Sequence, residues 1–416
     1  SHMEAWGANL MACLRFQSTE GQEIYVKTAV SGVSTAGALE NLKELDGLTF
    51  DDVRKNADQL WEKELGKYQM KGDLKAKQTF YTSVYHTALH PFIFQDADGN
   101  YRGLDKNIQK AEGFTNYTTF SLWDTYRAFH PLLNLVNQPL QADIANSMLA
   151  HYDKSVEHML PFWSFYGNET WCMIGYHSCS VLADMIVKGV KGFDYERASE
   201  AMQTTAMNPH YDCLPEYREL GYVPFDKEAE SVSKTLEYAY DDYCIAQAAK
   251  VLGKTEDYEY FMKRSKHYLN LIDPETKYMR GRDSKGNWRT PFSPIAYQGP
   301  GSVHGWGDIT EGFTMQYTRT VPHDFEGYME VAGKDLLLKR LDDMFTTEMD
   351  KDIPGAHDIQ GRIGAYWHGN EPCHHVTYLY NWLGEPWKCQ KWVRTIADSF
   401  YGNEPGSLSG NDDCGQ

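Results

Sequence analysis

Residues 301–324 read GSVHGWGDITEGFTMQYTRTVPHD, the densest combination of glycine, aromatic and ionisable residues in the chain. The glycines predict a turn. From Glu311 onward, apolar residues at helical spacing predict a helix that ends at Val321-Pro322, because proline cannot continue a helix. A carboxylate beside a tryptophan at a helix entrance has its pKa raised by desolvation, as a general acid requires. The alternative is that Asp308 and Glu311 only interact with the helix N-terminus.

The chain on both sides of this run has mainly helical patterns, with apolar residues recurring at spacings of three and four. The expected helices cover roughly residues 50–65, 78–89, 118–136, 140–160, 174–189, 195–207, 229–252, 255–270, 325–347, 374–382 and 386–399. The connections are short and contain glycine or proline, and no repeat of fixed period is visible, which disfavours a solenoid. Antiparallel helices with aromatic, polar loops at one end predict a toroid of helical hairpins.

The N-terminal segment, residues 8–35, has a different pattern. Two β-favouring runs, ANLMACLRFQ and EIYVKTAVSGVS, are separated by the turn signal STEG at residues 18–21. Two strands do not form a stable unit alone. We therefore expect them to pair with another element, or to be the end of a β domain whose earlier part is absent. Residues 1–3 read as a scar from tag removal.

The composition narrows the classes of partner. The 416 residues carry a formal net charge of −18, which argues against a nucleic-acid or anionic-membrane surface. No run of about 18 apolar residues exists, so no transmembrane helix is expected. Aromatic residues make up 14% of the chain, and flat aromatic faces suit sugar rings, although they also fill cores. The 8 cysteines include no C-x-x-C pair, and most are expected to be buried free thiols.

A candidate sugar-binding group lies in residues 117–133, YTTFSLWDTYRAFHPLL. Trp123 offers a platform, and Asp124 and Arg127 lie three residues apart near the start of the expected helix. Carboxylate and guanidinium groups bind sugar hydroxyls in bidentate fashion. The alternative is a helix-surface ion pair beside a core tryptophan.

Polar residues also fall inside helical patterns. A lone histidine such as His177, in an apolar run, is more often a satisfied core residue than a ligand. Glu237 and Asp241 lie four residues apart, with like charges on one helix face. This arrangement costs stability unless a cation or a hydrogen-bond donor lies between them.

Candidate metal ligands lie in residues 365–387. Asn370 and Glu371 offer adjacent oxygen ligands in a turn before Pro372, and oxygen-only ligands suit Ca²⁺. A zinc site around His374-His375 would need a third ligand at a spacing that is not present, and the H-E-x-x-H motif is absent.

The last residues, 407–416, read SLSGNDDCGQ. Taken alone, Asn411, Asp412 and Asp413 belong to a polar turn. We expect the chain to be cut there inside a motif.

Together these motifs resemble glycoside hydrolase family 92, the calcium-dependent exo-acting α-mannosidases. The matching segments occur in one order over about residues 80–416: LWDTYR at 122–127, MIG with His177 at 173–177, TEG with QY at 310–317, VPHD at 321–324, GNEP with HH at 369–375, and GNDD with GQ at 410–416. The resemblance implies an (α/α)6 barrel as the catalytic domain over 41–416. It also implies that residues 4–40 end an N-terminal β-sandwich and that the C-terminal end of the domain is missing.

The resemblance implies inverting hydrolysis of terminal α-mannosides, commonly with α-1,2 or α-1,3 linkages. Glu311 would protonate the leaving oxygen, and Asp413 would activate the water. Asn411 or Asp412 would assist Asp413, although many relatives have an acidic residue where this chain has Asn411.

The resemblance also implies the binding roles. Asn370 and Glu371 would be among the ligands of a Ca²⁺ ion that binds O2 and O3 of the mannose. Trp123 and Asp124, with Arg127, would hold the terminal sugar. His368 would lie near the leaving sugar, followed by Gly369 where α-1,2 enzymes have Glu.

Two alternatives remain on the sequence. One is a mannoside-binding protein without turnover, and the other is a different helical-toroid glycosidase, such as a trehalase-like enzyme. The partner expected from the resemblance is a mannose-containing glycan. The expected location is secreted, periplasmic or on the cell surface, although no signal segment is visible in the chain.

Overall fold

The computed structural model describes residues 7, 9–298, 307–349, 360–404, 407–410 and 413–414. The described chain is mainly helical, with strands only in short antiparallel pairs. The α-helices are α1 (Thr35–Leu42), α2 (Phe50–Leu65), α3 (Leu74–Thr87), α4 (Leu122–Thr125), α5 (Phe129–Val136), α6 (Gln138–Lys154), α7 (Ser178–Lys188), α8 (Tyr195–Ala206), α9 (Leu214–Leu220), α10 (Ser231–Val251), α11 (Thr255–Arg264), α12 (Thr314–Tyr317), α13 (Phe325–Ala332), α14 (Lys334–Thr346), α15 (Leu379–Trp382) and α16 (Pro386–Phe400).

Short 3₁₀ helices and strand pairs connect these helices. The 3₁₀ helices are η1 (Lys43–Leu45), η2 (His267–Leu271), η3 (Glu371–Cys373) and η4 (Val376–Tyr378). The strand pairs are β1 (Phe92–Ile93) with β4 (Tyr117–Thr118), β2 (Asn100–Arg102) with β3 (Ile108–Lys110), β5 (Ser164–Phe165) with β6 (Asn168–Glu169), and β7 (Arg362–Ile363) with β8 (Tyr366–Trp367).

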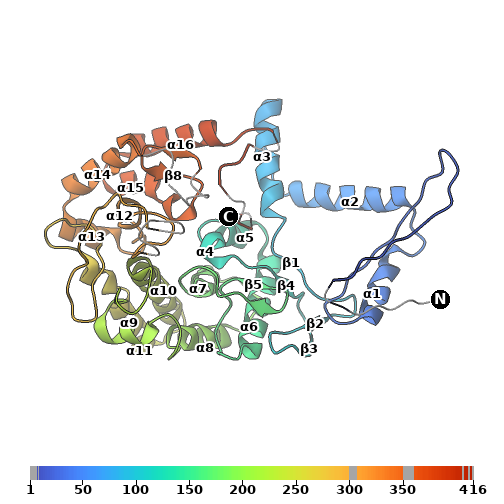
Figure 1. The fold of residues 1–416 in the computed structure, drawn as a ribbon, viewed down its shortest axis with the longest axis horizontal. Helices are drawn as coiled ribbons and strands as arrows, with labels where there is room; N and C mark the ends of the chain where they lie inside the picture. The colour runs from blue at the N-terminus through green and yellow to red at the C-terminus, as the bar shows by residue number, and fades with distance from the viewer. Residues whose placement is uncertain are drawn as a thin grey trace.

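The helices from α6 onward follow one another around the body of the molecule. In Figure 1 they pass from α6 and α8 at the lower side, through α9, α11 and α13, to α14 and α16 at the upper side. Helix α10 packs against α7, α8 and α11, and most of its residues are buried. After α16 the chain returns towards α4 and α5, where the C-terminus is marked (Figure 1). This return brings the end of the chain close to the start of the helical body.

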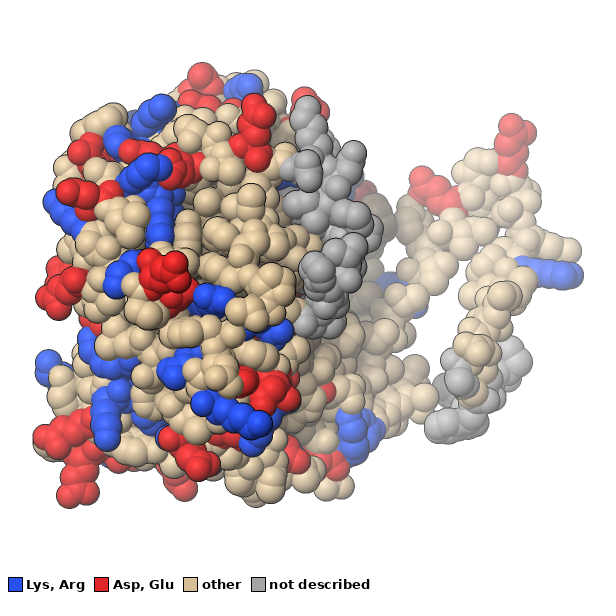
Figure 2. Space-filling model, turned by 60° about the vertical axis from the view of Figure 1, so that its left-hand side comes forward, with Lys and Arg blue, Asp and Glu red and all other residues tan. Residues whose placement is uncertain are grey.

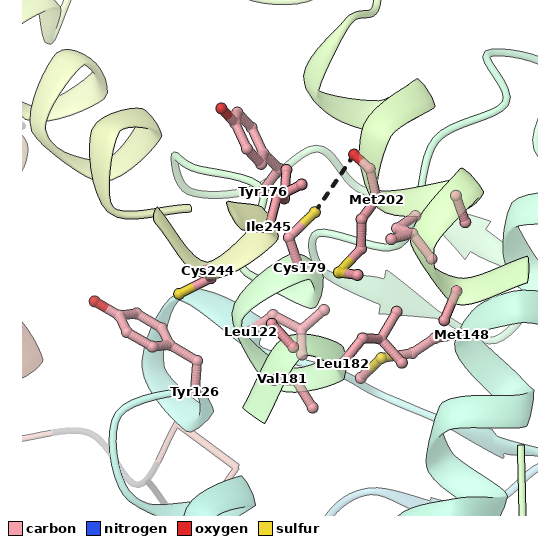
Figure 3. Packing of buried hydrophobic residues seen from close by; sticks show 14 of the residues in the cluster. Leu122, Tyr126, Met148, Tyr176, Cys179, Val181, Leu182, Met202, Cys244 and Ile245 are labelled. Carbon is pink, nitrogen blue, oxygen red and sulfur yellow. Dashed lines mark hydrogen bonds between the residues drawn. The ribbon is translucent and has the colours of Figure 1, made fainter. Parts of the chain in front are cut away.

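The core consists of two clusters of apolar side chains. The first lies between α5, α6, α7, α8 and α10, and the second lies among α10, η2 and the elements from α12 to α16. Figure 3 shows the first cluster, in which Leu122, Met148, Leu182 and Ile245 pack together from four helices. Burying one such side chain contributes about 1.5–3 kcal/mol. The two clusters hold the loops between the helices at fixed positions.

The structure shows the state of the cysteines and the distribution of charged side chains on one face. All 8 cysteines are free thiols, and five of them are buried. Acidic and basic side chains are interspersed on the face that Figure 2 shows, with no continuous basic stripe there. In the part of the chain that the structure describes, no helix has both the length and the apolar character needed to cross a membrane.

The long helix expected over 118–136 is broken in the structure. Helix α4 is a single turn that ends at Thr125, and α5 begins at Phe129. Thr119 has a φ of 69°, and Ala128 has non-helical backbone angles, so neither continues a helix. The apolar spacing persists through the break because the irregular residues are buried as well.

The helices expected from residue 174 and from Glu311 also begin later than the pattern indicated. Helix α7 starts at Ser178, with His177 at its N-cap, because Gly175 has a φ of 82°. Glu311 has a φ of 47° and lies in a turn, three residues before the single turn of α12. Glu311 is therefore not the first residue of a helix.

The strands expected within 8–35 are not formed in the described part of that segment. Residues 9–30 are extended or turn-like, carry no ladder and are almost entirely exposed. Helices α1 and α2 bury no residue, although Thr49 and Asp52 form a capping box that starts α2. Figure 1 shows this segment projecting from the helical body. A strand pair with nothing packed on either face gains no apolar burial, which explains why the β pattern alone does not produce a sheet.

Candidate active site

A small cavity of about 90 Å³ lies where five separate segments of the chain meet. The lining residues are Ser121, Trp123, Asp124, Trp163, Cys172, Met173, Glu311, Gly369, Asn370, Glu371 and Asp413. They come from the start of α4, the β5–β6 hairpin and its continuation, the turn before α12, the entrance to η3 and the end of the chain. The return of the chain after α16 therefore completes this pocket.

Carboxylates dominate the pocket. Oxygen atoms of Asp124, Glu371 and Asp413 lie within 4.8 Å of one another, and Glu311 lines the same cavity. Glu371 and Asp124 are almost fully buried, with 2% and 3% of their surface exposed. Acidic groups this close repel one another unless a proton or a cation lies between them.

The pKa values report this repulsion. Burial, followed by the charge of Asp413, raises the pKa of Asp124 to about 8. Burial and the charges of Asp124 and Asp413 raise the pKa of Glu371 well above its ordinary value. Within the described residues, Oδ1 of Asp124 and Oε1 of Glu371 have no hydrogen-bond partner, while the Ser121 hydroxyl donates to the other oxygen of Asp124. The pocket thus has surplus negative charge and unused oxygen acceptors.

Several pocket residues adopt backbone conformations that are unusual for residues other than glycine. The φ angles of Glu311, Met173 and Asp413 are 47°, 65° and 30°, and those of the neighbouring Trp171 and Cys414 are 55° and 66°. Such conformations cost about 1–3 kcal/mol each and cluster at functional sites. Their concentration around one cavity supports its assignment as the active site.

Asn370 and Gly369 join two of the pocket segments. The Asn370 side-chain amide donates to the backbone carbonyl of Glu311 at 2.9 Å, which ties the turn before α12 to the entrance of η3. Gly369 lies directly against the backbone of Gly410, where an added Cβ would come within 2.9 Å of the Gly410 Cα. A side chain at residue 369 would therefore push away the segment that carries Asp413.

Asp308 has a structural role, although at the N-terminus of α10 and not at the helix expected from Glu311. Its carboxylate accepts from the Ser231 hydroxyl at 3.0 Å and from Arg289 Nε at 2.6 Å. Its backbone carbonyl accepts from the N–H groups of Val232 and Ser233, at the start of α10. Asp308 stabilises the N-terminus of α10 and does not line the cavity.

Trp123 and Arg127 lie at one wall of the pocket. Trp123 is buried and lines the cavity, whereas Arg127 lies behind it. The Arg127 Nε donates to the backbone carbonyl of Trp123 at 3.0 Å, and the guanidinium lies 5.3 Å from the centre of the Trp123 ring. Arg127 thus acts on the pocket through its charge and through Trp123.

His368 lies in a different cavity. A larger space of about 680 Å³ is lined by His368, Arg127, His374 and His375, among others. The two ring nitrogens of His368 lie 2.9 Å and 2.7 Å from the hydroxyls of Tyr366 and Tyr401. Burial lowers the pKa of His368 to about 3, so its ring is neutral.

Three residues considered from the sequence, Asn411, Asp412 and Trp306, lie outside the described residues. The structure also adds pocket residues that the sequence pattern did not indicate. Trp163, Cys172 and Met173 come from the loop region around β5 and β6, where no periodic pattern exists. Ser121 had no signal of its own, although it directly precedes the LWDTYR segment that carries the family resemblance.

The chain matches the catalytic domain of glycosyl hydrolase family 92 over residues 37–416. It therefore belongs to this family. A family GH92 α-mannosidase from Bacteroides thetaiotaomicron, solved in complex with mannoimidazole, is 78% identical to it, with a TM-score of 0.92 over 92% of this chain and 51% of that protein. A family GH92 inverting mannosidase from the same organism is 31% identical, with a TM-score of 0.81 over 92% of this chain and 54% of the other.

Among curated proteins, an uncharacterized secreted glycosidase of Arthroderma benhamiae is 24% identical over 97% of this chain and 50% of that protein. The chain thus spans about half the length of the relatives that it matches. Its helical body corresponds to the family's catalytic domains, which are (α/α)6 barrels, so the expected fold class is confirmed. The division of the chain near residue 40 stays a prediction.

Proposed function

We propose that this chain forms the catalytic part of an exo-acting, inverting α-mannosidase that removes terminal α-linked mannose, α-1,2 or α-1,3, from glycans. The observation that carries the proposal is the convergence of Asp124, Glu311, Glu371 and Asp413 on one small cavity. The two solved relatives named above are an α-mannosidase and an inverting mannosidase, which supports the same substrate and stereochemistry here.

In this proposal Glu311 is the general acid and Asp413 the general base. Inversion needs one carboxylic acid that protonates the leaving oxygen and one carboxylate that activates water on the opposite face of the sugar. The two residues come from the turn before α12 and from the end of the chain, so they enter the cavity from separate segments. A cavity with surplus negative charge favours a carboxyl group that keeps its proton, as a general acid must. Asn411 assists Asp413.

The residues present fit a Ca²⁺ ion. The unpartnered oxygens of Glu371 and Asp124 and the nearby carboxylate of Asp413 form an oxygen-only donor set, which a hard divalent cation prefers. We assign Glu371 and Asn370 to the ion. When bound, Ca²⁺ would supply a Lewis acid for vicinal hydroxyls of the sugar. Asp124 and Asp413 would face the sugar hydroxyls and the attacking water.

The size of the cavity supports exo action. Its volume of about 90 Å³ is far below the 300–1,000 Å³ typical of sites for drug-sized ligands. Such a pocket encloses one terminal sugar rather than an internal segment of a glycan. Trp123 provides an aromatic wall for that sugar, and Asp124 an acceptor for its hydroxyls. His368 remains a candidate contact for the leaving sugar, on the side of the larger cavity.

A panel of α-1,2, α-1,3, α-1,4 and α-1,6 mannobioses, with and without Ca²⁺, tests the proposal. We expect release of mannose from the α-1,2 or α-1,3 disaccharide, complete loss with a chelator and recovery with Ca²⁺. Binding of mannoimidazole without any product after long incubation would indicate a mannoside-binding protein instead. Hydrolysis of trehalose but not of mannobiose would indicate another toroid glycosidase. We also propose a secreted, periplasmic or cell-surface location, as for the fungal relative named as secreted.

A further inference from the structure

A network of buried charged side chains lies behind the wall of the pocket. His177, at the N-cap of α7, lies between two carboxylates of α10, with Nδ1 2.8 Å from Asp241 and Nε2 3.2 Å from Glu237. The other oxygen of Glu237 lies 3.6 Å from Nη2 of Arg127. All four residues are buried, and at most 9% of any of the side chains is exposed. His177 is therefore the donor between Glu237 and Asp241 that their like charges required.

The charges of the four side chains in this buried network balance. Burial would lower the pKa of His177, but Asp241 and then Glu237 raise it to about 9, so the imidazole is doubly protonated at neutral pH. Burial would raise the pKa of Glu237, yet the imidazole of His177 at 3.2 Å and the charge of Arg127 lower it. Two cations thus face two carboxylates, which is the arrangement that makes buried charges tolerable.

This network of buried charges is connected to the pocket through Arg127 and Trp123. The Arg127 Nε donates to the backbone carbonyl of Trp123 at 3.0 Å, and the guanidinium lies 5.3 Å from the centre of the Trp123 ring, which lines the cavity. The guanidinium of Arg127 opposes the rise in pKa that burial imposes on Asp124 and Glu371. Glu237 therefore pairs with the cation that contacts the Trp123 wall, without lining the cavity itself.

We propose that Glu237, held by His177, is a positioning residue for the mannoside pocket: it restrains the Arg127 guanidinium and, through Arg127, the Trp123 wall of the pocket. This inference rests on the function proposed above. Removal of the Glu237 charge frees Arg127 to move towards Asp124 and Glu371. The Trp123 wall loses the fixed position of the Arg127 side chain behind it at the same time. Both changes weaken binding of the sugar and of the divalent cation.

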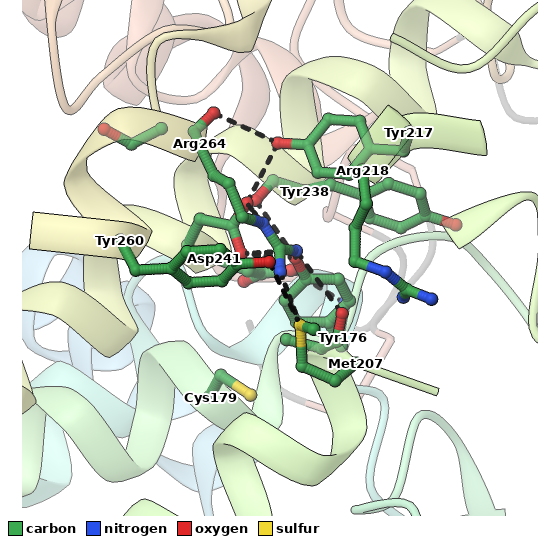
Figure 4. A network of polar contacts seen from close by, with 12 residues as sticks. Tyr176, Cys179, Met207, Tyr217, Arg218, Tyr238, Asp241, Tyr260 and Arg264 are labelled. Carbon is green, nitrogen blue, oxygen red and sulfur yellow. Dashed lines mark hydrogen bonds and ion pairs between the residues drawn. The ribbon is translucent and has the colours of Figure 1, made fainter. Parts of the chain in front are cut away.

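The same helix offers a matched control in Asp242. This carboxylate is equally buried and pairs with Arg264 at 2.9 Å, and it accepts from the hydroxyls of Tyr176 at 2.8 Å and Tyr217 at 3.0 Å. Figure 4 shows this network around Arg264. None of these four residues lines the pocket. Asp242→Asn therefore reports the cost of removing a buried charge from α10 without touching the pocket wall.

The test compares Glu237→Gln with Asp242→Asn by calorimetric titration of mannoimidazole in the presence of Ca²⁺, and of Ca²⁺ alone, at a temperature where both variants are folded. We expect both variants to melt at a lower temperature than the wild type. We expect only Glu237→Gln to weaken mannoimidazole binding, by about tenfold or more, as removal of an outer-shell partner does. Glu237→Asp, which keeps the charge but shortens its reach, should retain more affinity and also serves if Glu237→Gln does not fold.

Equal affinities for the wild type and Glu237→Gln would overturn the positioning role. Equal losses in Glu237→Gln and Asp242→Asn would also overturn it, because the effect would then be one of general stability. If the wild type bound no mannoimidazole, the proposed function itself would fail. The two failures are therefore distinguishable.

Discussion

Two clusters of buried carboxylates lie in this molecule, and they differ in what surrounds them. On α10, Glu237, Asp241 and Asp242 are fully buried, and each is paired with a cation or a donor: His177, Arg127 or Arg264. In the pocket, Asp124, Glu371 and Asp413 crowd within 4.8 Å of one another. There the hydrogen bond from Ser121 to Asp124 and the charge of Arg127 only partly oppose the rise in the pKa values of Asp124 and Glu371.

The pKa values follow the difference in surroundings. The pKa of Glu237 is lowered despite complete burial, and burial raises that of Asp242 only to about 6 because Arg264 opposes it. Burial and the neighbouring carboxylates raise the pKa of Asp124 to about 8. Burial alone therefore does not mark a functional carboxylate. The mark is burial beside other carboxylates, since such a cluster favours a proton, a cation or a substrate.

The largest expected effect falls on the pocket. Glu311→Gln removes the proton that the leaving oxygen needs, so we expect hydrolysis of mannobiose to fall by about 10²–10⁴-fold in kcat/KM. Aryl mannosides with good leaving groups should lose much less, because they need little protonation. Kinetics on both substrate types provides the measurement. Equal losses on the two would contradict the assignment of Glu311 as the acid.

A substitution in the balanced cluster should act on stability instead. His177→Asn leaves Glu237 and Asp241 as like charges on one buried helix face, and breaking such a group costs about 3–5 kcal/mol. Because the pKa of His177 in the folded chain, about 9, is above that of an unfolded histidine, its contribution is complete below about pH 6.5. It is lost as the pH rises through 9. Urea unfolding of wild type and variant at pH 6, 8 and 9.5 should show a gap in stability that closes with rising pH. A gap that widened with pH would refute this account.

Calcium should stabilise the protein in a pH-dependent way. In the ion-free folded protein, Asp124 keeps its proton up to about pH 8 because its pKa is raised. In the unfolded chain, the same side chain loses its proton near pH 4. Its stability therefore falls between these pH values, and Ca²⁺ must compete with this proton. At a concentration 100 times its Kd, the ion contributes about 2.7 kcal/mol. We expect a larger increase in Tm from Ca²⁺ at pH 8 than at pH 6. The same increase in Tm at pH 6 and at pH 8 would count against a Ca²⁺ site made of carboxylates.

The smallest expected effect is the change in stability when a buried glutamate is replaced by glutamine. We expect this change to have opposite signs in the two clusters. Glu371→Gln removes one of the crowded charges, so the ion-free protein should gain about 0.5–2 kcal/mol of stability while losing Ca²⁺ binding, the trade-off expected at a strained site. The matched change Glu237→Gln should lower stability. Thermal unfolding with a chelator at pH 8 compares them. A loss of stability in both variants would show that the pocket charges are already balanced.

The sequence predicted the helices well where their periodicity is long. The patterns at 195–207, 229–252 and 386–399 correspond closely to α8, α10 and α16. It failed at 118–136 and at Glu311, because apolar spacing does not register a residue with non-helical backbone angles, such as Ala128 or Glu311. In the segment 9–30, β-favouring composition gave no ladder, since pairing depends on neighbours that a local pattern does not contain.

Local patterns singled out Glu311, Asp124 and Glu371 as candidates, whereas Asp413 came from the family resemblance alone. Asp124 and Asp413 are brought together by the return of the chain after α16, which no spacing rule describes. The Glu237 and Asp241 pair was different, because its like charges at four-residue spacing required a donor, and His177 supplies it. Trp163 and Met173 were missed, since their loop carries no periodic signal.

The central claim is that the carboxylates that converge on the pocket form a cation-assisted, inverting mannosidase site. Proton NMR of an α-linked mannobiose during the first minutes of hydrolysis, with Ca²⁺ and then with a chelator, tests it most directly. The account predicts that β-mannose appears first with Ca²⁺ and that no mannose is released with the chelator. Release of α-mannose first, or equal rates in both samples, would contradict it.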